Sequence, residues 1–143
     1  MNTPQTNGPA LARSAADALR RGDPRSARDL FLQAARAGQV DVPVFMGLAF
    51  ACLALEDWPG VAASTDRVLL LDPRNLRALI MRGDVHEREG DSRAAAAYYL
   101  TALRSAPPAD KAPRDLLPEL RRVQQKHEQF TQRYTQHVLK YLQ

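Results

Sequence analysis

The chain has 143 residues, a formal net charge of +4 and a single cysteine. This length suits one domain with a continuous core, and no apolar run is long enough for a signal peptide or a transmembrane helix. Because the lone Cys52 cannot form an internal disulfide, we expect a reducing, cytoplasmic setting. Alanine, leucine and arginine dominate while β-branched residues are sparse, which favours an all-α fold. The basicity is local: residues 1–110 carry 13 Lys+Arg and 13 Asp+Glu, whereas residues 111–143 carry 7 and 3.

After a polar tail over residues 1–7, which we expect to be disordered, six helices of similar length follow in chain order. Gly22 and Gly90 are suited to the left-handed conformation that ends a helix. Asp23, Asp57 and Asp91 each come where a carboxylate would cap the next helix. The pattern therefore predicts three helix pairs, with helices at about 9–21, 24–37, 42–55, 58–71, 75–89 and 92–105.

Equivalent residues of these pairs recur every 34 positions. Asp91 maps back to Asp57 and Asp23, and Tyr99 shares its register with Thr65 and Phe31. The order of Gly83, Ala95, Tyr99, Ala102 and Pro107 resembles the tetratricopeptide repeat (TPR) pattern. The resemblance covers residues 8–107 as units 8–41, 42–75 and 76–109, and it implies a right-handed superhelix, an α-solenoid. Departures from the pattern are Glu56 for the turn glycine, Thr65 for the aromatic residue and Arg82 for a leucine.

A proline-rich linker, 108–114, precedes a long amphipathic helix predicted over 115–143, with Asp115 as its cap. One apolar stripe runs along this helix at spacings of three and four, and includes Leu120, Val123, Phe130, Tyr134, Val138 and Tyr141. We expect its first half to cap the third repeat, with Leu116, Leu120 and Val123 packed against Tyr98 and Tyr99. The second half should overhang and cover itself with a second copy, as a homodimer, or with the groove or a missing domain.

Basic residues follow the other side of the last helix, namely Arg122, Lys126, Arg133 and Lys140. We interpret them as a solvated helix face, and we expect neither nucleic-acid binding nor membrane insertion. The chain contains no phosphate-binding loop, dinucleotide turn or nucleophile elbow. None of His86, His127 and His137 has metal-ligand spacing, and His86 and Cys52 are expected to be structural. The sequence thus predicts no cofactor, no metal and no enzyme activity within these residues.

In TPR arrays the first helix of each pair lines a concave groove. The resemblance places Arg13, Ala16, Arg20, Met46, Phe50, Leu53, Arg77, Ile80, Met81, Asp84 and Arg88 on that surface. Family members that clamp a carboxyl terminus use lysines and asparagines there, and this chain has none at the matching sites. Its apolar strip suits an amphipathic helix or an apolar peptide of a protein partner. The alternative is that the chain's own N-terminus or last helix covers the strip.

Two other functions are compatible with the sequence. The arrangement of repeats, proline break and long helix is similar to the segment that precedes the catalytic domain of bacterial aspartyl/asparaginyl β-hydroxylase-like proteins. Those are 2-oxoglutarate and Fe(II) dependent oxygenases, and any such activity would lie outside these residues. The length is also similar to that of secretion-type TPR chaperones, which hold an extended translocator segment in a groove.

Overall fold

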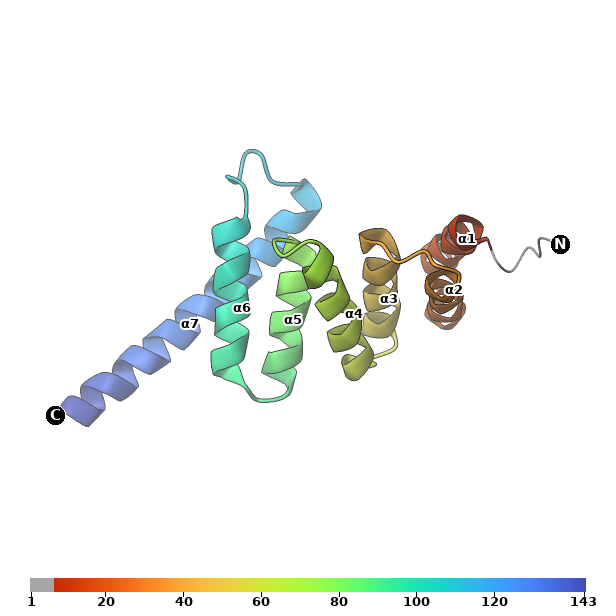
Figure 1. Cartoon of the computed structure of the whole chain (residues 1–143). Helices are drawn as coiled ribbons and strands as arrows, with labels where there is room; N and C mark the ends of the chain where they lie inside the picture. The colour runs from red at the N-terminus through yellow and green to blue at the C-terminus, as the bar shows by residue number, and fades with distance from the viewer. Residues whose placement is uncertain (1–6) are drawn as a thin grey trace. The chain divides into compact units, whose positions relative to one another are not determined.

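The computed structural model describes residues 7–143, so the expected disordered tail lies, apart from Asn7, outside the described residues. Every regular element of that part is helical, as predicted (Figure 1). The elements are α1 (Gly8–Arg20), α2 (Pro24–Arg36), α3 (Val42–Ala54), α4 (Trp58–Leu71), α5 (Leu76–Arg88), α6 (Ser92–Ser105), the short 3₁₀ helix η2 (Arg114–Leu116) and α7 (Leu117–Leu142). The first six helices begin and end within one residue of the predicted bounds.

Side-chain caps recur with the same 34-residue period as the helices. Asp23, Asp57 and Asp91 accept backbone hydrogen bonds at the starts of α2, α4 and α6, which confirms the prediction. A second set, Asn7, Asp41 and Asn75, caps α1, α3 and α5 in the same way. Each of the six oxygens satisfies one of the free N–H groups of a first helical turn.

The turns between the paired helices share one backbone conformation. Gly22 and Gly90 have φ of 77° and 80°. Glu56, at the same register of the second repeat, has φ of 56°. A non-glycine residue in the left-handed region costs about 1 kcal/mol, so the period imposes the turn even where the glycine is missing.

The chain forms two compact units, residues up to Pro73 and residues from Arg74 onward. In the first unit, α1, α2 and α3 build a core of mostly small side chains around Phe31, which is 4% exposed. Gly47 of α3 allows this packing, because a Cβ there would lie only 2.2 Å from the Phe31 ring. Thr65, in the aromatic register, is fully buried and donates its hydroxyl to Val61 O at 2.7 Å.

In the second unit, α5 and α6 form an antiparallel pair and α7 packs against α6 before running beyond it (Figure 1). Tyr99 of α6 lies over Gly83 of α5, where a Cβ would be 2.4 Å from the ring. Leu116 and Val123 are buried, as the capping prediction requires. The predicted cap was wrong: Leu116 is the N-cap of α7 without a side-chain bond, and Asp115 in η2 instead pairs with Arg77.

Tyr98 departs from its predicted place against α7. Its ring stacks on His86 of α5, with centroids 5.3 Å apart, and the Arg82 guanidinium carbon lies 5.9 Å from the Tyr98 centroid. Adjacent residues on a helix point about 100° apart, so Tyr98 and Tyr99 cannot both face α7. The cation–π contact also explains why arginine is accepted at the leucine position.

Candidate functional site

An apolar cavity opens between α1 and α3 in the first unit. Its volume is about 320 Å³, and Ala16, a predicted groove residue, contributes to its wall. The other lining residues are Pro9, Ala12, Phe31, Gln39, Asp41, Pro43 and Val44. The small side chains of Ala12 and Ala16 on α1 leave this space, and Phe31 forms part of its wall. The first helices of two successive pairs therefore meet around a cavity of side-chain dimensions.

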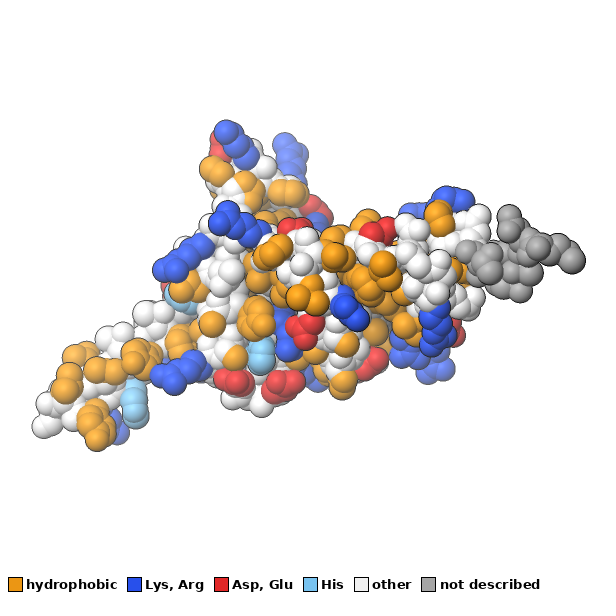
Figure 2. Space-filling view, viewed as in Figure 1, with side chains coloured by type: hydrophobic (Ala, Val, Ile, Leu, Met, Phe, Trp, Pro, Cys, Tyr) orange, Lys and Arg blue, Asp and Glu red, His pale blue; other side chains and the backbone are white. Residues whose placement is uncertain are grey.

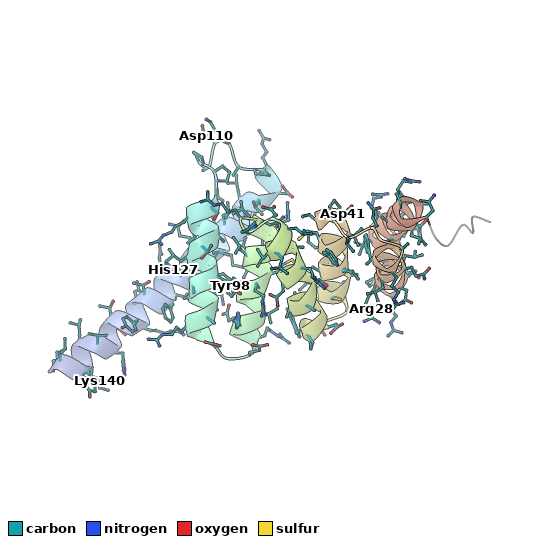
Figure 3. The ribbon with its side chains drawn as sticks, in the orientation of Figure 1. Arg28, Asp41, Tyr98, Asp110, His127 and Lys140 are labelled. Carbon is teal, nitrogen blue, oxygen red and sulfur yellow. The ribbon has the colours of Figure 1, made fainter. Side chains whose placement is uncertain are left out.

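The polar side of this cavity is fixed by an internal hydrogen bond. Gln39 donates from Nε2 to Asp41 Oδ2 at 2.6 Å, while Oδ1 of the same carboxylate caps α3. Asp41 lies at the first turn of α3 (Figure 3). Because both carboxylate oxygens are engaged, the cavity presents an ordered polar edge beside an apolar interior.

Two exposed apolar residues lie farther along α3. Phe50 and Leu53 are 38% and 37% exposed, and their role in binding remains a prediction. Met46, one turn earlier, is buried and contributes to packing instead. On α1, Arg13 and Arg20 are exposed, and Arg20 pairs with Asp17 on its own helix.

The predicted groove residues of the second unit have different surroundings. Ile80 and Met81 are buried, so their side chains are closed to solvent. Arg77 and Asp84 bond to the segment that follows the linker, through Asp115 and Arg122. Arg88 is exposed at the end of α5. The α5 surface is thus occupied in part by the chain's own last helix, and the binding role of these five residues remains a prediction.

A hydrogen-bonded network joins α5, α6 and α7. Arg122 donates to both oxygens of Asp84, at 3.0 and 2.9 Å, and also to Glu119 at 2.8 Å. Lys126 donates to Glu87 at 2.6 Å. The Tyr99 hydroxyl lies 2.5 Å from Asp84 Oδ1 and 2.9 Å from Glu87 Oε2. The interpretation of Arg122 and Lys126 as a solvated face was therefore wrong, because both bind acidic residues of α5.

Sequence reasoning missed the bonds of Arg122 and Lys126 to α5 because their partners are 38 and 39 positions away. The signal that could have found them is the spacing: acidic Asp84 and Glu87 on one helix match basic Arg122 and Lys126 on another. Such pairs face the same way on their own helices, but only the docking of α7 aligns them.

The network shifts the ionisation of three of its members. The hydrogen bond to Asp84 raises the pKa of the Arg122 guanidinium. Burial, together with hydrogen bonds to Asp84 and Glu87, raises the pKa of the Tyr99 phenol well above its usual value. Burial works to raise the pKa of Glu87, but the hydrogen bonds from Lys126 and Tyr99 outweigh it and hold that pKa below its usual value. The folded state therefore favours a protonated Tyr99 beside an ionised Glu87.

These shifts predict how stability changes with pH. The folded pKa of Tyr99 is raised, so its contribution is complete below the unfolded value of about 10 and is lost as pH rises beyond it. The folded pKa of Glu87 is lowered, so its contribution is present above the unfolded value of about 4.3 and is lost as pH falls through the folded pKa. Urea unfolding should show the wild-type advantage over Tyr99→Phe shrinking above pH 10, and that over Glu87→Gln shrinking below pH 4. Differences constant with pH would contradict the assignment.

A reactive cysteine, a metal site or a membrane-spanning helix would each indicate a different function. Cys52 is buried as predicted, and burial raises the pKa of its thiol. Within residues 7–143, no cluster of three or more His, Cys, Asp or Glu side chains is placed to hold a metal ion. Over the same residues, no helix combines the length and apolar character needed to cross a membrane.

No protein-family model and no curated protein match the sequence. Solved structures do match. The type III secretion chaperone SycD of Yersinia enterocolitica, in complex with a peptide of the translocator YopD, superposes with a TM-score of 0.75 at 17% identity, covering 87% of this chain and 92% of that one. The Sgt2 TPR domain of Aspergillus fumigatus matches at 0.67 and 18% identity, covering 91% and 83%. The first TPR domain of Spaghetti, bound to an HSP90 peptide, matches at 0.68 and 16% identity, covering 87% and 96%. The fold is therefore that of TPR domains.

Proposed function

We propose that this chain, which has the fold of TPR domains, is a non-catalytic interaction module that binds an apolar segment of a partner protein in the first unit. The observation that carries the proposal is the cavity between α1 and α3, large enough for an apolar side chain and followed along α3 by exposed Phe50 and Leu53. SycD and Spaghetti, which share the fold, are in complex with peptides. That likeness supports peptide binding here without identifying the peptide.

The chemistry of the cavity favours an apolar occupant over a terminal carboxylate. Among the described residues, no lysine or arginine lines it, and its carboxylate, Asp41, is held by Gln39 and by the α3 backbone. An anionic group entering it would face Asp41 without a compensating cation. We therefore propose that an aliphatic or aromatic side chain fills the cavity while neighbouring residues of the same segment cover Phe50 and Leu53.

The test is a peptide-display selection against the intact chain. The selected peptides are then labelled, and their affinity is measured by fluorescence anisotropy. Ala16→Trp should fill the cavity, and Phe50→Glu should place a charge on the apolar surface. Each change is expected to weaken binding by about tenfold or more. Leu70→Glu, which changes an exposed leucine of α4, is the matched control and should leave affinity unchanged. If the selected peptides bound the wild type and all three variants with equal affinity, the binding site would lie elsewhere.

A secretion-type chaperone is the second candidate, and the match to SycD favours it. Such a protein would keep an apolar, otherwise insoluble translocator in solution. Co-expression with the apolar secretion substrates of the same genome, and retention of one of them in the soluble fraction through Phe50, would support this role. Solubility that is unaffected by the chain would exclude it.

The hydroxylase-like arrangement also remains a proposal, in which these repeats precede an oxygenase domain. The exposed second half of α7 is the observation that favours it, because an adjoining domain would cover that surface. The test is to read the gene beyond Gln143. An iron-binding His-x-Asp/Glu with a distant His would support the oxygenase domain, and a stop codon directly after Gln143 would exclude it.

A further inference from the structure

The first half of α7 binds its neighbours through two adjacent strips. Its apolar strip contains Leu120 and the fully buried Val123, on the side that packs against α6. Its basic strip contains Arg122 and Lys126, which bond to Asp84 and Glu87 of α5. The surface that α7 recognises is therefore a pair of helices, one apolar and one acidic.

The second half of α7 repeats both strips, at positions that beyond Phe130 are mostly exposed in the part of the chain that the structure describes. At 100° per residue, Phe130, Tyr134, Val138 and Tyr141 continue the line of Val123, while Arg133 and Lys140 continue the line of Arg122 and Lys126. Tyr134 and Tyr141 are 52% and 85% exposed. Hydrophobic side chains gather on this projecting part of α7 (Figure 2), and Lys140 extends from it near its end (Figure 3).

A crevice connects the docked and undocked halves. It has a volume of about 80 Å³ and lies where α7 leaves α6, between Ala95, Ala96 and Tyr99 on one side and Phe130 and Arg133 on the other. Lys126 and Gln129 also line it. The crevice makes the exposed strips continuous with the interface that already holds the first half.

We propose that the second half of α7 is a docking surface for an acidic amphipathic helix of a partner protein. The partner helix would set a strip of small or aliphatic side chains against Phe130, Tyr134, Val138 and Tyr141, and its carboxylates against Arg133 and Lys140. This is the chemistry by which α5 and α6 hold the first half. Residues 130–142 span about 18 Å at the helical rise, which accommodates about three turns of a partner.

Charge argues against a second copy as the occupant. Between Gln129 and Gln143 the chain carries Arg133 and Lys140 and no Asp or Glu. In an antiparallel pair of such helices the same flank faces itself, so Arg133 of one copy would lie near Lys140 of the other. An acidic helix removes this repulsion and replaces it with attraction.

The probe is a labelled 21-residue peptide with leucine and alanine on one strip and glutamate on both flanks, and its control has lysine in place of every glutamate. With the intact chain at low salt, fluorescence anisotropy should show binding of the glutamate peptide alone. Tyr134→Ala with Tyr141→Ala, and Arg133→Glu with Lys140→Glu, are each expected to weaken it by about tenfold. The matched controls Leu70→Ala and Arg104→Glu should not.

Other outcomes overturn the proposal. If both peptides bound equally, or if neither bound, the surface would not be one that selects an acidic helix. A dimer detected by light scattering and abolished by Tyr134→Ala with Tyr141→Ala would assign the surface to a second copy. Co-sedimentation with phosphatidylserine-containing vesicles, lost in Arg133→Glu with Lys140→Glu and unaccompanied by peptide binding, would assign it to a membrane surface. Circular dichroism at 222 nm checks that each variant keeps its helices.

Discussion

Gly47→Ala is expected to lower the free energy of unfolding by about 2 kcal/mol, although glycine to alanine within a helix ordinarily gains about 1 kcal/mol. The new Cβ would lie 2.2 Å from Cζ of Phe31, which is itself buried. The ring must therefore leave its place in the core of the first unit. Urea denaturation of the intact chain measures the change.

The control is a second substitution that removes the clash between the new methyl group and the Phe31 ring. In the background of Gly47→Ala, Phe31→Leu should cost less than it does in the wild type, because the shorter side chain makes room for the methyl group. Gly83→Ala, whose Cβ would lie 2.4 Å from the Tyr99 ring, should be destabilising for the same reason in the second unit. A variant at Gly47 as stable as the wild type would show that the core accommodates the methyl group.

Val123→Asp is expected to release the first half of α7 and to destabilise the second unit by about 3 kcal/mol or more. Val123 has no exposed surface, so an aspartate there would be desolvated in an apolar site. Release would also break the bonds of Arg122 and Lys126 to α5. Hydrogen exchange of the α7 amides, which should accelerate most over residues 117–127, measures the detachment.

Tyr134→Asp is the matched control, because it places the same charge on the same stripe of the same helix at a half-exposed position. It should change the free energy of unfolding by less than about 0.5 kcal/mol. If both variants accelerated exchange equally, helix propensity and not docking would explain the effect. If neither did, α7 would not depend on the contact made by Val123.

The helix bounds were predictable because their signals are local. A cap such as Asp57 needs only the backbone of the next three residues, and the turn before it repeats with the period even when Glu56 stands for glycine. Asp115 shows the limit of this reasoning. It has the right residue type and position for a cap, but a 3₁₀ turn intervenes and its carboxylate pairs with Arg77.

The sequence could predict which helix face carries the candidate site, but it could not predict which side chains of that face are buried. The register placed Ala16, Phe50 and Leu53 on one surface, and all three are at least partly exposed or line the cavity. The same register could not distinguish them from Met46, Ile80 and Met81, which are buried. Helical periodicity gives the direction of a side chain, whereas burial depends on what packs over it.

The sequence alone determined three TPR helix pairs and an amphipathic last helix, because spacing, caps and turns act within a few residues. Only the tertiary structure decided that Arg122 and Lys126 bond to Asp84 and Glu87, and that the α1–α3 cavity exists at all. Both depend on residues many positions apart, and their alignment is set by how whole helices pack. The repeat pattern can therefore be recognised in the sequence, whereas the surfaces that remain open to a partner depend on how the helices pack.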